Sequence, residues 1–344
     1  MATRVWSKAN MDGGDPRYAV GSFMHQGGRD SQEDGVVIEV DFNLYIHKVA
    51  KVNNMREPKV DASVPRTIAV LLDGHGGASC MNYVQNRIIP HVALCYLKNP
   101  RLGWPEAIQT AITTLERRWL RKAPAEEFVD RSGTTLTVCV IEGNKLHCGW
   151  VGDSPCWLQK NDGSTQLVTR PHRPQDRKEV ERILDAGGEI RRKEGAPMLC
   201  FLPPVKSGPE RVYPGGLNIT RSLGDVRCKL EQYGGCQGVI IGTPEVASVD
   251  LGCDTSHIVL CSDGLSDNLR NGPRELYRVL KTKHCNDQST PVEPTPEMSP
   301  GPSLDMNVMA ETLAEKCVRY GMRKSRYVAH QDNTTAIVIC VRDK

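Results

Sequence analysis

Five aspartates stand at or beside the ends of predicted strands, where a rigid backbone can aim their carboxylates at one point. Each aspartate alone is explained more simply as part of an ordinary turn. Together they point to a cation, because converging carboxylates repel one another and are costly to bury without one. Carboxylate oxygens with almost no cysteine or histidine among them suit Mg²⁺ or Mn²⁺ rather than zinc. The five are Asp34, Asp73, Asp153, Asp263 and Asp332.

Other residues near these aspartates have types that could assist catalysis. His75 follows Asp73 by two residues, and this position makes an otherwise structural histidine a candidate proton donor. Arg29 precedes Glu33 by four residues and could hold a phosphate as a bidentate fork, although an isolated arginine is normally a solvated surface group. Gly74 lacks a side chain, so its backbone carbonyl could approach a metal closely.

The elements that must position these residues mix hairpins with pairs of helices. This order favours an α+β fold of antiparallel sheets covered by helices over a parallel doubly wound sheet. Apolar and β-branched runs predict strands at 18–23, 35–40, 67–72, 134–141, 145–151, 156–160, 258–261 and 335–341. Helices are predicted at 79–97, from 104 onward, at 177–186, at 273–281 and around 306–320.

Three further stretches are not predicted to be regular core elements. Residues 49–65 are polar and marked by proline, which indicates an excursion loop. Residues 193–216 are rich in glycine and proline and are expected to form an irregular subdomain. Residues 285–303 are dense in Pro, Ser and Thr, which predicts a flexible surface insertion.

Composition restricts the class of protein. The formal net charge of +3 over 344 residues is too small to indicate binding to nucleic acid or to a membrane surface. No apolar run is long enough for a membrane span. The N-terminus lacks a signal-peptide pattern, and the 13 cysteines contain no Cys-x-x-Cys pair. Cys139, Cys261 and Cys340 lie in apolar runs and are interpreted as small buried hydrophobes. We therefore expect a reduced, intracellular protein of the cytoplasm, the nucleus or both.

Several motifs, taken in order, resemble those of the type 2C (PPM) family of metal-dependent protein phosphatases. The run Asp73-Gly74-His75-Gly76-Gly77 is similar to the most distinctive motif of that family. Other matches are Gly28–Asp34, Ser132–Thr135, Gly152–Ser154, Glu181–Ile183, Thr220–Asp225, Pro244–Val246, Ser262–Leu265 and Asp332–Asn333. The resemblance covers residues 18–341, and an ordered series of this kind is far more specific than any single motif.

The resemblance implies a four-layer α/β/β/α sandwich of two central antiparallel β-sheets flanked by helices. Residues 1–17 would be an N-terminal extension and 18–343 the catalytic domain, with a flap at 193–216 and the insertion at 285–303. The resemblance also implies the metal ligands. They are Asp34, Asp73 (bridging two ions), Gly74 through its carbonyl, Asp263, Asp332, Glu33 through water, and Asp153 for a weaker third ion.

On this interpretation the protein binds two Mg²⁺ or Mn²⁺ ions and hydrolyses phosphoserine and phosphothreonine in phosphoprotein substrates. A water shared by the two ions would attack phosphorus without a phosphoenzyme intermediate. Arg29 would neutralise phosphate oxygens, and His75 would protonate the leaving oxygen. We expect a monomer that binds neither nucleic acid nor membrane.

Two alternatives remain at this point. A pseudophosphatase would keep the fold as a binding or regulatory module, but such proteins typically lose metal ligands, and here every expected aspartate is present. A metal-dependent hydrolase of small phosphate esters is the other alternative. Three residues depart from the family pattern, namely Pro155, Pro171 and Ser266. They are expected to alter packing, and Ser266 to loosen the neighbourhood of Asp263.

Overall fold

The computed structural model describes residues 2–3, 18–56, 60–61, 63–125, 129–194, 206–286, 306–324 and 332–341 of the 344. The predicted insertion at 285–303 therefore lies almost wholly outside the described residues, as does nearly all of the predicted extension at 1–17.

Six antiparallel strands form the first sheet, in the order β1-β2-β16-β14-β8-β9. Strand β16 is buried along almost its whole length, which explains why its sequence is a continuous apolar and β-branched run. The strands are β1 (Ala2–Thr3), β2 (Tyr18–His25), β8 (Cys156–Lys160), β9 (Thr165–Leu167), β14 (Thr255–Cys261) and β16 (Thr334–Val341).

Seven antiparallel strands form the second sheet, in the order β12-β5-β4-β6-β7-β13, with β3 paired to β4. They are β3 (Asp34–Glu39), β4 (Arg66–His75), β5 (Gly133–Thr134), β6 (Leu136–Glu142), β7 (Lys145–Val151), β12 (Leu223–Gly224) and β13 (Glu245–Asp250). The inner faces of the two sheets pack on each other through a shared set of buried apolar side chains. That set includes Ala69, Leu71, Ile141, Ile258, Leu260, Ile337 and Ile339.

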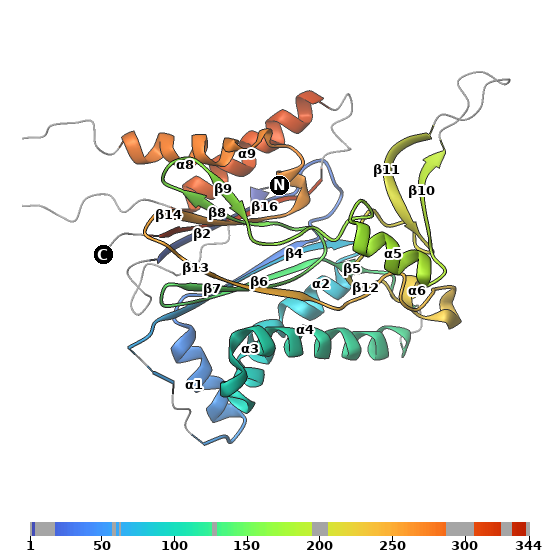
Figure 1. Ribbon diagram of the computed structural model, residues 1–344, viewed down its shortest axis with the longest axis horizontal. Coiled ribbons are helices and arrows are strands. Elements are labelled where there is room, and N and C mark those ends of the chain that lie inside the picture. The colour runs from blue at the N-terminus through green and yellow to red at the C-terminus, as the bar shows by residue number, and fades with distance from the viewer. Residues whose placement is uncertain are drawn as a thin grey trace, which may run out of the picture.

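Helices cover the outer face of each sheet (Figure 1). Helices α8 (Arg274–Asn286) and α9 (Met306–Lys324) lie on the first sheet. The second sheet is covered by α1 (Phe42–Val52), α2 (Ser79–Gln85), α3 (Ile88–Lys98) and α4 (Gly103–Lys122). The expected four-layer α/β/β/α sandwich is therefore confirmed. No helix in the described parts of the chain is long and apolar enough to cross a membrane.

Several short elements connect the strands and helices of the four layers. They are α5 (Arg177–Asp185), α6 (Val226–Lys229), α7 (Asp263–Ser266), β15 (Arg270–Pro273), and the 3₁₀ turns η1 (Pro100–Leu102), η2 (Ala123–Ala125) and η3 (Glu231–Tyr233). The three cysteines predicted to be small hydrophobes, Cys139, Cys261 and Cys340, are indeed buried among apolar side chains.

The single helix predicted at 79–97 was wrong, because two helices fill this range. The chain turns between α2 and α3 at Asn86 and Arg87. Pro90 gives the physical reason. In an unbroken helix its ring would clash with the carbonyl of Asn86, four residues earlier, whereas it fits the first turn of a new helix.

The predicted excursion loop at 49–65 was also wrong at its start, because helix α1 runs to Val52. Asp41 caps this helix by accepting a hydrogen bond from the Leu44 backbone N–H at 3.0 Å. The buried residues of α1, namely Phe42, Ile46, Val49 and Ala50, recur at three- and four-residue steps. The sequence therefore contained both signals for this helix.

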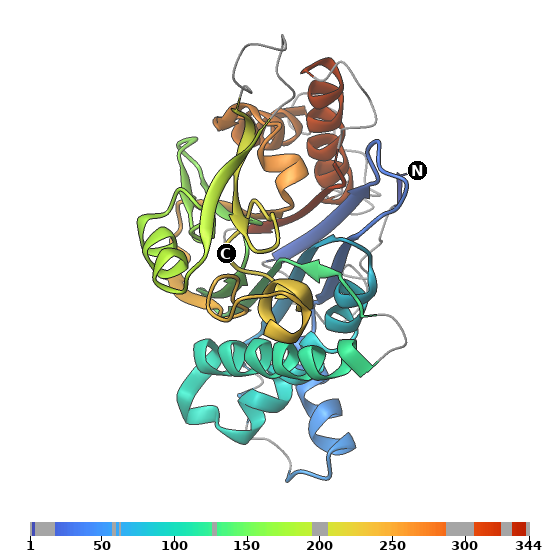
Figure 2. The same cartoon turned by 90° about the vertical axis from the view of Figure 1, so that its right-hand side faces the viewer.

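Residues 193–216 are more regular than predicted. Strands β10 (Glu189–Glu194) and β11 (Lys206–Tyr213) form a two-stranded antiparallel ribbon, with residues 195–205 outside the described range. The ribbon stands beside α5, on the side of the molecule that faces the viewer in Figure 2. A small apolar cluster lies at its base, built from Ile183, Val212, Cys228, Val239 and Ile240.

A buried carboxylate ties α5 to the segment before β12. Glu179 accepts hydrogen bonds from Arg182 at 2.7 Å, from the Thr220 hydroxyl at 2.6 Å and from Arg221 at 2.5 Å. Burial alone would raise the pKa of Glu179, but the hydrogen bonds from Arg221, Thr220 and Arg182 outweigh it and lower the pKa to about 2. The ionised carboxylate therefore stabilises this side of the fold.

We predict that Glu179→Gln destabilises the protein at pH 7 by about 3 kcal/mol, because it removes the buried negative charge to which both Arg182 and Arg221 donate. A depressed carboxyl pKa gives stability that is present above the unfolded value near 4.5 and is lost as pH falls toward 2. The difference in free energy of unfolding between the unmodified protein and Glu179→Gln should therefore shrink as the pH falls from about 4.5 to about 2. Urea unfolding at a series of pH values measures it.

Glu181→Gln is the matched control, because Glu181 forms an exposed pair with Arg177 on the same helix. Its free energy of unfolding should change by less than about 0.5 kcal/mol. Equal losses in the Glu179 and Glu181 variants would contradict the assigned role of Glu179.

Candidate metal centre

The pairing of β3 with β4 brings two predicted ligands together. In this antiparallel register Asp34, the first residue of β3, and Asp73, two residues before the end of β4, are direct Cα partners. The backbone N–H of Gly74 donates to the Glu33 carbonyl at 3.1 Å. A side chain at Gly74 would overlap that carbonyl, so the close approach of the two strands requires glycine here.

The other two predicted ligands of the ion pair come from the first sheet. Asp263 begins α7 directly after β14, and its backbone N–H lies 3.4 Å from Asp73 Oδ2. Asp332 precedes β16, and the next residue, Asn333, accepts a hydrogen bond from the Glu33 backbone N–H at 2.8 Å. Residues 300 positions apart are thereby held at one edge where the two sheets meet.

A pocket of about 510 Å³ opens at this edge. Every predicted site residue except Asp34 contributes to its wall. The predicted site residues in its lining are Arg29, Glu33, Asp73, Gly74, His75, Asp153, Asp263 and Asp332. Arg211 from β11 and residues 217–219 also line the pocket. Arg211, a residue of the ribbon strand β11, therefore contributes to the pocket wall.

The carboxylates at this edge are unfavourable in their ionised forms, because they are buried and repel one another. Burial, and then the neighbouring charges of Asp263 and Asp34, raise the pKa of Asp73 well above its usual value. Burial, and then Asp153 and Asp332, do the same to the pKa of Asp263. Burial raises the pKa of Asp34 to about 7 despite a 2.5 Å hydrogen bond from Thr335 to its Oδ2. Its other oxygen, Oδ1, is buried and has no hydrogen-bond partner among the described residues.

These features fit divalent cations held by oxygen ligands. A buried carboxylate oxygen without a donor is expensive, and a cation would satisfy it. A cation would also offset the mutual repulsion that raises these pKa values. The donor set is made of carboxylates and a backbone carbonyl, which are the ligands that Mg²⁺ and Mn²⁺ prefer.

His75 forms a dyad that the sequence did not reveal. Its Nε2 lies 2.8 Å from Asp225 Oδ2 and 3.0 Å from Oδ1, and the imidazole is 29% exposed. Burial would lower the pKa of His75, but the carboxylate of Asp225 outweighs it and raises the pKa above its usual value. A side chain at Gly133 would overlap both members of the dyad, so this glycine makes room for it.

Asp225 is itself held in place by buried groups. It adopts a left-handed backbone conformation (φ 52°) and accepts a 2.5 Å hydrogen bond from the Ser222 hydroxyl. Lys229 donates to the Ser222 carbonyl at 2.7 Å and pairs with Glu116 of α4 at 2.5 Å. Glu116 also accepts from the Gly224 backbone N–H at 2.9 Å. The outer helix layer thus fixes the loop that carries Asp225.

Besides His75, three predicted site residues already have charged partners. Arg29 pairs with Asp332 at 2.7 Å, and both side chains are about half exposed at the mouth of the pocket. Asp153, the predicted ligand of a third ion, is buried and pairs with Arg173 at 2.7 Å. Arg173 also contacts Asp267 at 3.2 Å. Arg173 therefore competes with any cation for Asp153, which the sequence analysis did not foresee.

The three departures from the family pattern leave the backbone around the site intact. The Pro155 carbonyl accepts from the Cys261 N–H at 3.2 Å, and the Pro171 carbonyl from the Arg173 N–H at 3.0 Å. Ser266 donates to the Asp263 carbonyl at 3.4 Å within α7. Ser266 therefore contacts the aspartate beside which looser packing was expected.

Comparisons with known proteins agree with the geometry of the site. The protein phosphatase 2C family model matches residues 25–325. Probable protein phosphatase 2C 3 of Oryza sativa subsp. japonica is 30% identical over 251 residues, which are 66% of this chain and 48% of that protein. Human protein phosphatase 1E is 27% identical over 315 residues, 92% of this chain and 33% of that protein. The chain thus spans half or less of the length of these two relatives.

Solved structures share the fold. A serine-threonine phosphatase 2C from Toxoplasma gondii aligns over 99% of both chains with a TM-score of 0.67 and 14% sequence identity. A sex determining protein of C. elegans aligns over 94% of this chain and 65% of its own, with a TM-score of 0.65 and 22% identity. These structures support the fold, and the family match extends over most of the sequence. The chain belongs to the protein phosphatase 2C family.

Proposed function

We propose that this protein is a metal-dependent protein serine/threonine phosphatase that acts on phosphoprotein substrates. The observation that carries the proposal is the convergence of Asp34, Asp73, Asp263 and Asp332 at one pocket edge, with an unpartnered oxygen on Asp34. A protein that used this pocket only for binding would have no need for so many converging carboxylates. Family membership supports the same activity.

Asp34, Asp73, Asp263, Asp332 and the Gly74 carbonyl would hold two Mg²⁺ or Mn²⁺ ions, with Glu33 acting through water. Such ions, when bound, lower the pKa of water and neutralise phosphate charge. Asp153 would contribute to a weaker third site only if Arg173 releases it. The chain itself supplies the rigid strand ends that keep these oxygens in place.

His75 would donate the proton that the departing serine or threonine oxygen needs. Since Nε2 is bound to Asp225, the proton to be delivered is the one on Nδ1. Asp225 would orient the imidazole and stabilise its charged form. Ser222, Lys229 and Glu116 would keep Asp225 in place during turnover.

Arg29 would bind the phosphate group at the mouth of the pocket, exchanging its contact with Asp332 for phosphate oxygens. Arg211 also lines the pocket and already donates to the Gly216 carbonyl at 2.6 Å. Two arginines in the lining of one pocket suit a dianionic phosphate more than a neutral ligand.

We predict that a chelator abolishes phosphopeptide hydrolysis and that Mg²⁺ or Mn²⁺ restores it. Asp73→Asn and Asp263→Asn should each lower kcat by at least about 100-fold, because asparagine keeps the shape but lacks the charge that a cation requires. In metal-free protein the same variants should be as stable as the unmodified chain or more stable, by about 1–2 kcal/mol, because repulsion is relieved. Phosphate release and calorimetry measure the two effects.

Asp250→Asn serves as the control, because Asp250 is an exposed strand-end aspartate 3.5 Å from Lys145. It should change neither kcat nor stability appreciably. Full activity after metal removal would refute the proposed chemistry. Tight binding of phosphopeptides without any turnover at saturating Mn²⁺ would favour the pseudophosphatase, and a preference for small esters would favour the metabolite hydrolase.

A second prediction concerns the His75–Asp225 dyad. His75→Gln should slow phosphopeptide hydrolysis about 10²–10⁴-fold but p-nitrophenyl phosphate hydrolysis much less, because nitrophenolate leaves without a proton. Asp225→Asn should show the same substrate dependence with a smaller loss, at least about tenfold on phosphopeptide. The comparison requires kcat for both substrates at saturating Mn²⁺.

His91→Gln is the matched control, since His91 lies on α3 and bonds to Arg118 and to the Arg87 carbonyl. It should leave both rates unchanged. Parallel losses on both substrates in the His75 variant would exclude His75 as the proton donor. Loss of Mn²⁺ affinity in that variant would indicate a role in metal binding instead.

A further inference from the structure

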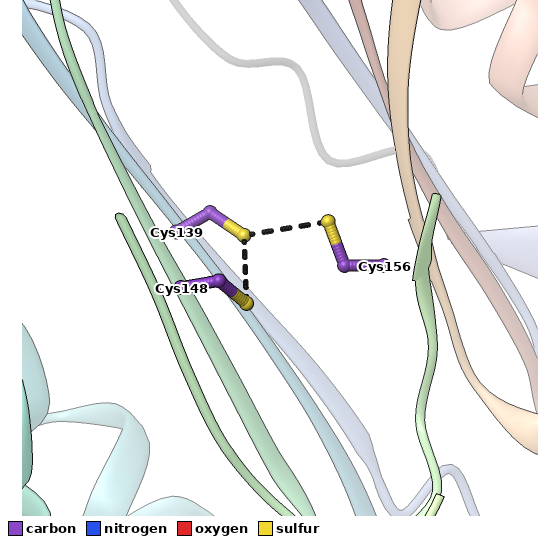
Figure 3. A group of neighbouring side chains, drawn as sticks. All are labelled: Cys139, Cys148 and Cys156. Carbon is purple, nitrogen blue, oxygen red and sulfur yellow. Dashed lines mark hydrogen bonds between the residues drawn. The ribbon is translucent and has the colours of Figure 1, made fainter. Parts of the chain in front are cut away.

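Three cysteine thiols meet between the two sheets, in the interior and outside the pocket described above. Cys139 of β6 and Cys148 of β7 are direct cross-strand partners, and Cys156 of β8 faces them from the other sheet (Figure 3). The Cys139 sulfur lies 3.6 Å from that of Cys148 and 3.7 Å from that of Cys156. All three residues are at most 1% exposed.

The spacing of these sulfurs resembles that of thiolates around one ion. Thiolate sulfurs bind metals at about 2.3 Å, which places them about 3.8–4.0 Å apart in tetrahedral or trigonal geometry. The three sulfurs all lie within 4.8 Å of one another. Two of the pairs need shifts of a few tenths of an ångström to form such a site, and the pair Cys148 and Cys156 needs less than about 1 Å. No disulfide joins them, because a disulfide requires sulfurs at about 2.05 Å.

The composition of the cluster restricts which ion it could hold. Among the described residues no histidine or carboxylate joins the three cysteines, and the surrounding side chains are apolar. Structural zinc is almost always four-coordinate. Copper(I) is soft, prefers sulfur, and is satisfied by three ligands. We propose that Cys139, Cys148 and Cys156 form a three-sulfur copper(I) site that links the two central sheets.

With copper(I), the charge left in the interior depends on how many of the three thiols lose a proton. Binding would break two S–H bonds and form copper–sulfur bonds, with two protons released to solvent and the third thiol keeping its proton. The copper stays in the +1 state, so no oxidant or reductant is needed. The resulting net charge of −1 is less costly in an apolar interior than the −2 of three thiolates. Because the thiols are buried, the ion would have to bind before the two sheets pack together during folding.

The test uses the full chain produced in copper-supplemented cells and purified without oxygen in the presence of a copper chelator. We expect about one copper per chain by elemental mass spectrometry. X-ray absorption should show copper bound to three sulfurs and to no nitrogen or oxygen. The copper-containing protein should also have a higher Tm than copper-free protein, since an ion that binds only the folded state stabilises it.

Cys139→Ala and Cys156→Val should reduce the copper content to background. Cys261→Ala is the matched control, because Cys261 is equally buried but outside the cluster, and it should keep the copper. Copper absent from the unmodified chain would overturn the proposal. The proposal would also be overturned if Cys139→Ala kept as much copper as the unmodified chain, or if the absorption spectrum showed nitrogen or oxygen ligands. An intact mass two hydrogens below that of the reduced chain would show a disulfide instead, and would overturn it as well. The absorption measurement uses only the unmodified chain, so it tests the copper site even if a variant fails to fold.

Discussion

The repulsion between carboxylates at one sheet edge is the constraint on which the rest of this structure depends. Antiparallel pairing of β3 with β4 sets Asp34 opposite Asp73, and the ends of β14 and the start of β16 bring Asp263 and Asp332 to the same edge. Such an arrangement survives in a folded chain only if the strands are held by strong packing elsewhere. Two sheets with apolar faces on both sides, each covered by helices, supply that packing.

The same constraint explains why the outer helices matter for chemistry. Helix α4 covers the second sheet, yet its buried Glu116 also reaches Lys229 and the Gly224 backbone. Those contacts fix the loop that presents Asp225 to His75. A helix that would otherwise only bury apolar surface therefore takes part in positioning the candidate proton donor. Glu179 has a comparable role on the opposite side of that loop, where it binds Thr220 and Arg221.

Much of the fold was accessible from local patterns. The runs that became β7 and β8 were placed to the residue, because strand periodicity and the turn residues between them are local signals. The errors also have local causes. Pro90 divides the helix predicted at 79–97, and the cap at Asp41 with its apolar stripe marks a helix that was overlooked. The ribbon β10–β11 was missed because its glycines and prolines suggested irregular structure.

The sequence by itself determined the family and the candidate aspartates, since residue type and short spacing carry that information, and the layer order followed from the family resemblance. Only the tertiary structure decided which groups accompany them. Asp225 lies 150 residues from His75 and Lys229 lies 113 from Glu116, so no spacing could pair them. Arg173 and Asp153 are only 20 residues apart, and Cys156 and Cys139 only 17, but no short-range pattern links either pair. Such contacts depend on how sheets stack and loops close, and burial then makes each pairing strong.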